Sequence, residues 1–251
     1  MNAERPSVGR VGAMSDEDRI VQAVEVQDVS FAWPGRDAYG VEIEHFALDA
    51  GSSTLLLGPS GSGKSTFLSL LCGIAMPTRG MINILGTDIT KLSGRQRDRF
   101  RAEHIGIIFQ MFNLLPYGSV RDNVALPLSF AHKRRERVLM QGTIAAEVSK
   151  MLQALGLSDK QINGRSSALS VGQQQRVAIA RALMGSPELI VADEPTSALD
   201  NERRARFLEL LMQQVSRANA TLIVVSHDET LADQFDQVLH LNDIVTAKAA
   251  P

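Results

Sequence analysis

The feature of the sequence that most constrains the fold is the octapeptide Gly58–Ser65, which has the pattern Gly-x-x-x-x-Gly-Lys-Ser. Its residues are Gly58, Pro59, Ser60, Gly61, Ser62, Gly63, Lys64 and Ser65. The apolar run Thr54–Leu57 before it is typical of a strand buried on both faces, and Ser65–Leu71 after it has helical character. Strand, glycine-rich loop and helix in this order predict an α/β fold that carries a phosphate-binding loop.

Each residue type in this loop has a chemical reason for its position. Glycines let the backbone curl, so that successive N–H groups converge on phosphate oxygens near the N-terminus of the next helix. The Lys64 ammonium supplies a full charge to the β- and γ-phosphates, and the Ser65 hydroxyl is placed to bind the Mg²⁺ that bridges them. The loop therefore predicts a site for ATP and Mg²⁺.

Two more apolar runs, Leu189–Ala192 and Thr221–Val225, each follow a helix-like segment and end in polar residues. They predict a parallel sheet flanked by helices, whose strand ends meet at one edge. There, Asp193 is expected to hold Mg²⁺ and Glu194 to orient and polarise the attacking water. His227 follows the second run. It is a candidate contact of the γ-phosphate or the water, and the alternative is a structural histidine.

The rest of the chain predicts two additions to this sheet. Val24–Phe31 alternates apolar and polar residues, and Val41–Glu44 is placed to pair with it as an antiparallel strand. Residues 111–175 have helical spacing and are expected to form an inserted helical subdomain. We therefore expect a flexible tail at residues 1–19 and one domain at residues 20–251.

Composition narrows the class of partner. Lys and Arg number 26 against 28 Asp and Glu, and a net charge of -2 makes nucleic acid a poor default partner. The basic run Lys133–Arg137 is expected to be a solvated helix face, with docking of acidic groups as the alternative. Cys72 is expected to be a packed thiol, which fits a reducing cytoplasm. No apolar run reaches the roughly 18 residues of a membrane-spanning helix, so another chain would have to span the membrane.

From about Val24 to Val245, the chain resembles the nucleotide-binding subunit of an ABC (ATP-binding cassette) transporter. Seven ordered motifs carry the resemblance: Walker A at Gly58–Ser65, the Q-loop at Phe109-Gln110, the signature at Leu169–Gln173, Walker B at Leu189–Asp193, the catalytic carboxylate Glu194, the D-loop Ser197-Ala198-Leu199-Asp200 and the switch histidine His227. The resemblance implies a P-loop NTPase fold with a RecA-like parallel sheet, an N-terminal antiparallel β subdomain and an inserted helical subdomain.

The resemblance also implies a role for each matching residue. ATP would be bound by Trp33, Gly58, Pro59, Ser60, Gly61, Ser62, Gly63, Lys64, Ser65, Thr66 and Gln110. Mg²⁺ would be held by Ser65, Gln110 and Asp193, and catalysis would involve Glu194, His227 and Lys64. The signature residues Ser170, Val171, Gly172 and Gln173 would contact the ATP of a partner subunit, and Asp200 would act in the D-loop.

Two of these positions leave alternatives open. Trp33 matches the aromatic residue that stacks on adenine, but core filling is an alternative for Trp33, and Phe31 is an alternative stacking residue. Val171 stands where the family signature has glycine. Only glycine enters positive φ cheaply, and a β-branched side chain could crowd an approaching phosphate, so a weaker signature is expected.

One copy of each motif implies a dimer with two ATP molecules between the subunits. Such subunits drive a separate integral membrane permease from the inner face of the membrane and do not touch the cargo. Ile108–Pro116 and Leu169–Met184 look most similar to the macrolide-exporter and lipoprotein-release group, so export, lipoprotein release or mechanotransmission is favoured. The alternatives are a soluble ABC ATPase that serves a scaffold such as iron–sulfur assembly, and a non-hydrolysing module. The interval between Lys64 and Asp193 leaves no room for the coiled coil of DNA-repair relatives.

Overall fold

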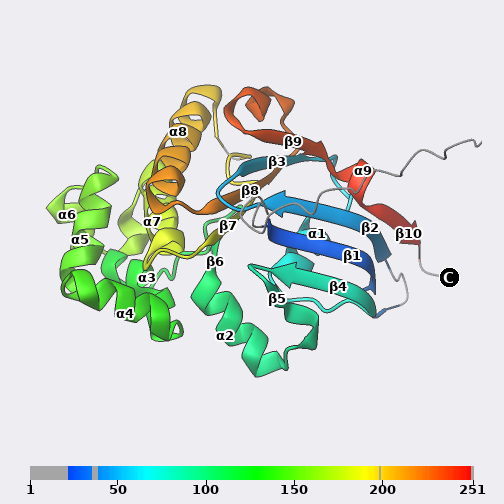
Figure 1. Cartoon of the computed structure of the whole chain (residues 1–251). Helices are drawn as coiled ribbons and strands as arrows, with labels where there is room; N and C mark the ends of the chain where they lie inside the picture. Colours follow the sequence, from blue (N-terminus) through cyan, green and yellow to red (C-terminus); the bar gives the residue numbers. More distant parts are fainter. Residues whose placement is uncertain (1–21, 36–38, 198, 250–251) are drawn as a thin grey trace, which may run out of the picture.

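The structure is a computed structural model that describes residues 22–35, 39–197 and 199–249. The tail expected at residues 1–19 lies outside the described residues. Two sheets form the centre of the described chain, and a group of helices lies at one side of them (Figure 1). Within these residues, no helix combines the length and the apolar character needed to cross a membrane.

The first sheet is antiparallel, as the N-terminal pattern predicts. Its order is β10-β2-β1-β4-β5, with β1 (Gln22–Ala32), β2 (Tyr39–Asp49), β4 (Arg79–Ile84), β5 (Thr87–Asp88) and β10 (Thr246–Ala249). Val26 pairs with Phe46 on one side and with Ile82 on the other. All three side chains are buried, because alternate positions of each strand face the same core.

The second sheet is parallel and confirms the three strands predicted from apolar runs. Its order is β6-β7-β8-β3-β9, with β3 (Ser53–Leu57), β6 (Ile105–Ile108), β7 (Leu189–Asp193), β8 (Thr221–Ser226) and β9 (Gln237–His240). The four-residue strands β6 and β9 are additions that the sequence did not predict. Because all five strands run in one direction, their carboxyl ends lie along one edge of the sheet.

Helix α1 (Lys64–Leu71) fills the space between the two sheets. Phe67 of α1 makes an edge-on contact with Phe46 of β2, with 5.1 Å between the ring centroids. The same buried cluster includes Leu56 of β3 and Ile223 of β8. Cys72, at the end of α1, is 3% exposed, which confirms the packed thiol, and burial raises the pKa of this thiol to about 12.

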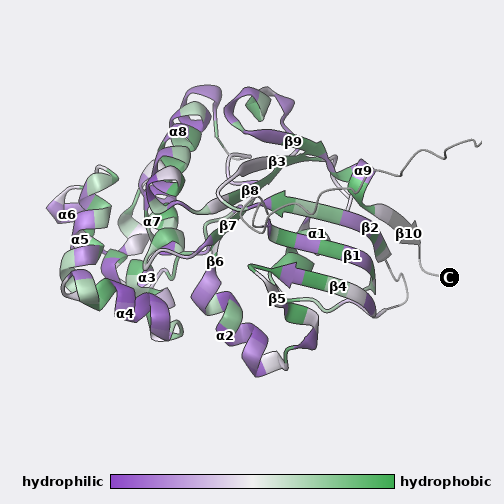
Figure 2. Ribbon diagram, viewed as in Figure 1, coloured by the Kyte–Doolittle hydropathy of each residue, from purple (hydrophilic) through white to green (hydrophobic). Residues whose placement is uncertain are grey.

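The remaining helices cover the parallel sheet and extend beyond it. They are α2 (Gly94–His104), α3 (Val120–Ala125), α4 (His132–Gln141), α5 (Ile144–Ala154), α6 (Asp159–Ile162), α7 (Val171–Leu183), α8 (Asn201–Ala218) and α9 (Leu241–Ile244), with 3-10 turns η2 (Ile89–Lys91), η3 (Leu126–Ser129), η4 (Ser166–Ala168) and η5 (Glu229–Gln234). Figure 2 shows that α2 and α4 are largely hydrophilic in colour.

The helical segment at residues 111–175 shares a hydrophobic core with the parallel sheet. Val148 and Leu152 of α5 belong to the same buried cluster as Leu55 of β3 and Ile190 of β7. The predicted end of the segment falls inside α7, which continues to Leu183. The segment is therefore helical as predicted, and its division from the rest of the domain stays a prediction.

The expectation that Lys133–Arg137 forms a solvated helix face is wrong for Arg134. Its side chain is 2% exposed and donates to the carbonyl oxygens of Ala182 (3.0 Å), Met184 (2.8 Å) and Ala102 (3.2 Å). Burial among these acceptors lowers the pKa of the Arg134 guanidinium to about 10. Arg134 lies four residues before the buried Val138, so it occupies the inner face of α4.

Candidate functional site

Most of the residues predicted to bind and hydrolyse ATP within one subunit line a single cleft of about 510 Å³ at the carboxyl edge of the parallel sheet. Its lining comprises Ser60, Gly61, Gly63, Lys64, Ser65, Thr66, Gln110, Asp193, Glu194, Ser197 and His227. They come from the β3–α1 loop and the first turn of α1, from the segment after β6, and from the ends of β7 and β8 and the residues that follow them. The parallel order of the strands explains why segments far apart in the sequence meet here.

The phosphate loop has the curled backbone that its glycines predict. Gly61 (φ 85°) and Gly63 (φ 94°) lie in the left-handed region, which strongly favours glycine. The Lys64 ammonium bends back over the loop and donates to the carbonyl oxygens of Gly58 (2.6 Å) and Pro59 (3.0 Å). The Ser62 hydroxyl is buried and has no hydrogen-bond partner among the described residues. A phosphate oxygen would satisfy such a group, so the loop fits its predicted ligand.

Ser65 and Asp193 form the part of the cleft suited to a metal. The Ser65 hydroxyl donates to Asp193 Oδ2 at 3.3 Å, and burial of the carboxyl, together with the charge of Glu194, raises the pKa of Asp193. No group of three or more His, Cys, Asp or Glu able to hold a metal occurs in the described part of the chain. A site with only a few protein oxygen ligands suits Mg²⁺, because this ion usually keeps several waters and binds substrate phosphates.

Glu194 lies at the centre of the charged contacts. Its carboxylate is 3.3 Å from the Lys64 ammonium and 2.9 to 3.0 Å from Nδ1 of His227. Its backbone has φ 45°, in the left-handed region, and its N–H donates to the Val225 carbonyl at 2.9 Å. Chemically, this carboxylate can accept a proton from a water held in the cleft, and the imidazole lies beside it.

Trp33 lies on the surface beside the phosphate loop. Its side chain is 42% exposed, and its indole N–H donates to Thr66 Oγ1 at 3.0 Å. Phe31 is 8% exposed and meets Trp33 edge-on with 4.9 Å between the centroids. Trp33 therefore does not fill the core, whereas Phe31 does. A flat aromatic face at this position is accessible to a base.

The signature residues lie at a different cavity, of about 460 Å³, lined by Ser170, Val171, Gly172 and Gln175 together with residues of α8. Ser170 is the N-cap of α7, and its N–H donates to Gln173 Oε1 at 2.9 Å in a capping box. The structure therefore does not bring Ser170–Gln173 to the ATP cleft of the same chain.

Val171 corrects one part of the sequence analysis. It is the first residue of α7, it is 45% exposed, and it is not among the described residues with positive φ. The backbone at this position therefore does not require glycine, because helical φ suits valine. Its side chain still stands at the helix start, where a phosphate would approach.

The Q-loop and D-loop residues meet at the edge of the cleft. Gln110 Nε2 donates to the Ser197 hydroxyl at 3.1 Å, so these two segments are in direct contact. Asp200 is the N-cap of α8 and accepts from the Arg203 N–H at 2.9 Å. Ala198 of the predicted D-loop lies outside the described residues.

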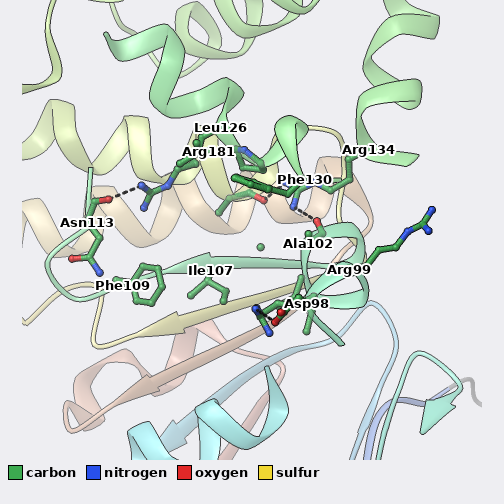
Figure 3. A pocket seen from close by; sticks show the side chains of 15 residues that line it. Asp98, Arg99, Ala102, Ile107, Phe109, Asn113, Leu126, Phe130, Arg134 and Arg181 are labelled. Carbon is green, nitrogen blue, oxygen red and sulfur yellow. Dashed lines mark hydrogen bonds and ion pairs between the residues drawn. The ribbon is translucent and has the colours of Figure 1, made fainter. Parts of the chain in front are cut away.

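A groove of about 730 Å³ lies next to the Q-loop, between β6 and the start of α4 (Figure 3). Ile107, Phe109, Leu126 and Phe130 contribute apolar surface to it, and Phe130 is 70% exposed. This groove was not predicted from the sequence, because its lining comes from several segments with no shared motif. The groove is the main feature near the cleft that has no counterpart among the predicted site residues.

Two charged groups that the sequence analysis did not single out hold the walls of this groove. Arg181 of α7 donates to the carbonyl oxygens of Phe112 and, at 2.8 Å, of Asn113 (Figure 3). Glu103 of α2 is buried and accepts from the N–H groups of His132 (2.7 Å) and Lys133 (2.9 Å). The signal for Arg181 was its place within the apolar run Val177–Leu183, where a solvated arginine would not fit.

Comparison with known proteins places this geometry in a family. Residues 42–197 match the family described as ABC transporter. A lipoprotein-releasing system ATP-binding protein LolD of Novosphingobium aromaticivorans is 40% identical over 204 residues, which cover 81% of this chain and 87% of the relative.

A macrolide export ATP-binding/permease protein MacB of Rhodopirellula baltica is 38% identical over 201 residues, which cover 80% of this chain but only 29% of the relative. Among solved structures, the ATP-binding cassette MJ0796, a dimer in a post-hydrolysis state bound to ADP and Pi, matches with a TM-score of 0.68. It is 33% identical, and the match covers 86% of this chain and 93% of that chain.

The family match spans more than half of the chain and contains the phosphate loop and the carboxylates at the end of β7. The cleft that these residues form has the groups needed to hold a triphosphate and to activate water. The chain belongs to the ABC transporter family and is an ATPase of that family.

Proposed function

We propose that the chain is the ATP-hydrolysing subunit of a transport complex. Two copies close around two ATP molecules and so drive a separate membrane permease. The observation that carries this proposal is the division of the ATP-binding groups between two cavities. Lys64, Asp193 and Glu194 line one cavity, whereas Ser170 and Gly172 line the other. A second copy is needed for both sets to reach the same nucleotide, and a dimer of identical subunits provides two such sites.

Within each site, the residues of the cleft divide the work. Lys64 and the loop N–H groups bind the β- and γ-phosphates, and Trp33 stacks on the adenine. Ser65, Asp193 and Gln110 hold Mg²⁺, which when bound supplies positive charge to the phosphate oxygens. Glu194 orients the attacking water and accepts its proton, and His227 contacts the γ-phosphate. Ser170, Val171, Gly172 and Gln173 of the partner cover the same ATP, next to its D-loop Asp200.

Lys64 contacts the carboxylate proposed to activate water. Its ammonium lies 3.3 Å from the Glu194 carboxylate. A bound triphosphate is a stronger partner for Lys64, because it carries several negative charges at short range. ATP binding would therefore draw Lys64 from Glu194 and leave the carboxylate to a water molecule.

The groove beside the Q-loop is the proposed docking site of the permease. It joins Ile107 of the parallel sheet to Phe130, which lies between η3 and α4 in the helical segment, and it lies next to Phe109 and Gln110. A short segment of the permease with an apolar face would fill it and would respond to movement of both walls. Arg99, whose exposed side chain reaches outward at the margin of the groove in Figure 3, favours acidic residues on the part of the permease that lies over this margin.

The names of the relatives favour one group of transport tasks. LolD is named for lipoprotein release and MacB for macrolide export. Export, lipoprotein release or mechanotransmission is therefore the proposed task, with the chain at the inner face of the membrane, held there by the permease and without contact with the cargo. A scaffold-serving ATPase is the alternative, and purification of the tagged chain with a membrane permease, rather than a soluble scaffold protein, would separate the two.

The decisive experiment replaces Glu194→Gln. The amide keeps the shape of the side chain but cannot take a proton, so we expect ATP turnover to fall about 10²- to 10³-fold. With Mg-ATP, light scattering after size exclusion should show a trapped dimer, and without nucleotide a monomer. Glu209→Gln, on the exposed face of α8, is the matched control and should behave as the parent. Turnover at the parental rate in Glu194→Gln would overturn the catalytic assignment.

A further inference from the structure

The turn that carries His227 is held by a side chain from another element. Asp228 follows His227, and its carboxylate forms an ion pair with Arg204 of α8. The other oxygen of Asp228 accepts from the Thr230 N–H (3.0 Å) and hydroxyl (2.6 Å). The side chains of Arg204 and Asp228 are only 23% and 16% exposed. A pair shielded to this degree is screened less by water and salt than a surface pair, so it holds its geometry more firmly.

Arg204 also reaches the segment that resembles the D-loop. It lies in the first turn of α8, where its N–H donates to the Asp200 carbonyl at 2.9 Å. Its guanidinium extends to the Leu199 carbonyl at 3.5 Å. One side chain therefore contacts the segment before α8 and the turn after β8. Among the described residues, Asp228 is the one carboxylate that pairs with Arg204.

His227 depends on this support because its own side chain has little packing. The imidazole is 57% exposed, and its Nδ1 lies within 3.0 Å of both carboxylate oxygens of Glu194. The backbone next to it is held by the hydrogen bond from the Asp228 N–H to the Ser226 hydroxyl, 3.1 Å long. The direction of the imidazole is therefore set by the turn at residues 226–228, and Arg204 is the link between that turn and α8.

We propose that Arg204 is a positioning residue for His227. Through Asp228 it holds the turn in the orientation that places the imidazole beside Glu194, and it moves that turn when Leu199 and Asp200 move. The catalytic consequence rests on the proposed function, in which His227 contacts the γ-phosphate. When two subunits close on the D-loop, Arg204 and Asp228 would then pass the movement to the imidazole.

The kinetic test compares variants of the pair. Arg204→Met should lower kcat on the order of tenfold and change KM for ATP less than about twofold, because phosphate binding by Lys64 is untouched. Arg204→Lys, which keeps the charge, should recover part of kcat. The exchange Arg204→Asp with Asp228→Arg should be more active than either single change. Arg217→Met, at the far end of α8, is the matched control and should match the parent.

The second test observes His227 without requiring turnover. The ring signals of the five histidines are recorded by NMR in the nucleotide-free protein, with His227→Gln to assign the signal. Arg204→Met should shift the His227 signal and leave the other four in place. An unmoved His227 signal, or equal loss of kcat in Arg217→Met, would overturn the proposal. A parent that lacks ATPase activity but shows the selective shift would refute the proposed function and support the positioning role.

Discussion

The nucleotide cleft and the groove beside α4 differ in what their charged side chains contact. In the cleft, Lys64 and Glu194 contact each other, so their charges are paired but available to a ligand that binds either one more strongly. In the groove, Arg134 and Arg181 are committed to backbone carbonyl oxygens, and the surface that remains is largely apolar. Under the proposed function, the charged groups of the cleft would change partners when nucleotide binds, whereas the groove would offer an apolar surface to the permease.

The largest expected effect comes from removal of the Lys64 charge, which should impair the cleft and leave the groove intact. Lys64→Met should weaken binding of a fluorescent ATP analogue with Mg²⁺ about 10²-fold or more, because several charge-assisted contacts to phosphate are lost together. Binding of the permease to the groove should persist in the absence of nucleotide. Lys150→Met, on exposed α5, is the control. Retained affinity in Lys64→Met would contradict the comparison, because nucleotide binding in the cleft would then not depend on the charge of Lys64.

The next prediction changes the groove and leaves the cleft intact. Phe130→Asp should weaken co-purification of the permease about 30-fold or more, because a charge replaces an exposed apolar anchor. The isolated subunit should retain its basal ATP turnover, since Phe130 does not line the cleft. Met140→Asp changes an exposed apolar residue of α4 and should leave the complex intact. Equal loss of complex in both variants would show that the groove is not the specific surface.

The smallest effect concerns the wall of the groove. Glu103→Ala should lower the free energy of unfolding by about 1 to 3 kcal/mol, because the N–H groups at the start of α4 lose a buried acceptor. Urea unfolding measures this change, and nucleotide affinity should stay at the parental value. Glu136→Ala removes an exposed carboxylate of α4 and should change the free energy of unfolding by less than about 0.5 kcal/mol. A loss of nucleotide affinity in Glu103→Ala would show that the groove wall and the nucleotide cleft are coupled, which contradicts the comparison.

The same contrast explains what could be predicted from the sequence. The cleft could be predicted because its functional residues lie in short contiguous motifs. An example is the phosphate loop, where positions with φ near 90° before Lys64 are occupied by glycine. The parallel strands followed from apolar runs that only a doubly buried strand would have. Sequence spacing could not place Ser170 in a cavity apart from Glu194, since that depends on tertiary packing.

The groove and its buried arginines were harder to predict because they depend on contacts between distant segments. Lys133–Arg137 looks solvated by composition, and only the spacing of Arg134 to Val138 marks it as inward facing. Glu103 gave no local sign that it would cap α4, which begins nearly thirty residues later. Such pairs are set by the meeting of two helices rather than by either helix alone.

Helix α7 makes the movements of these regions interdependent. Its thirteen residues span about 20 Å as a straight rod, from the Ser170 cap to the carbonyl groups that Arg134 binds. A side chain at Gly106 of β6 would come within 2.3 Å of the Ala182 carbonyl, so the far end of the rod rests directly on the sheet. Because α7 already lies in close contact with β6 at Gly106, a force on Ser170 at the other end of the helix would be passed to the parallel sheet at that contact.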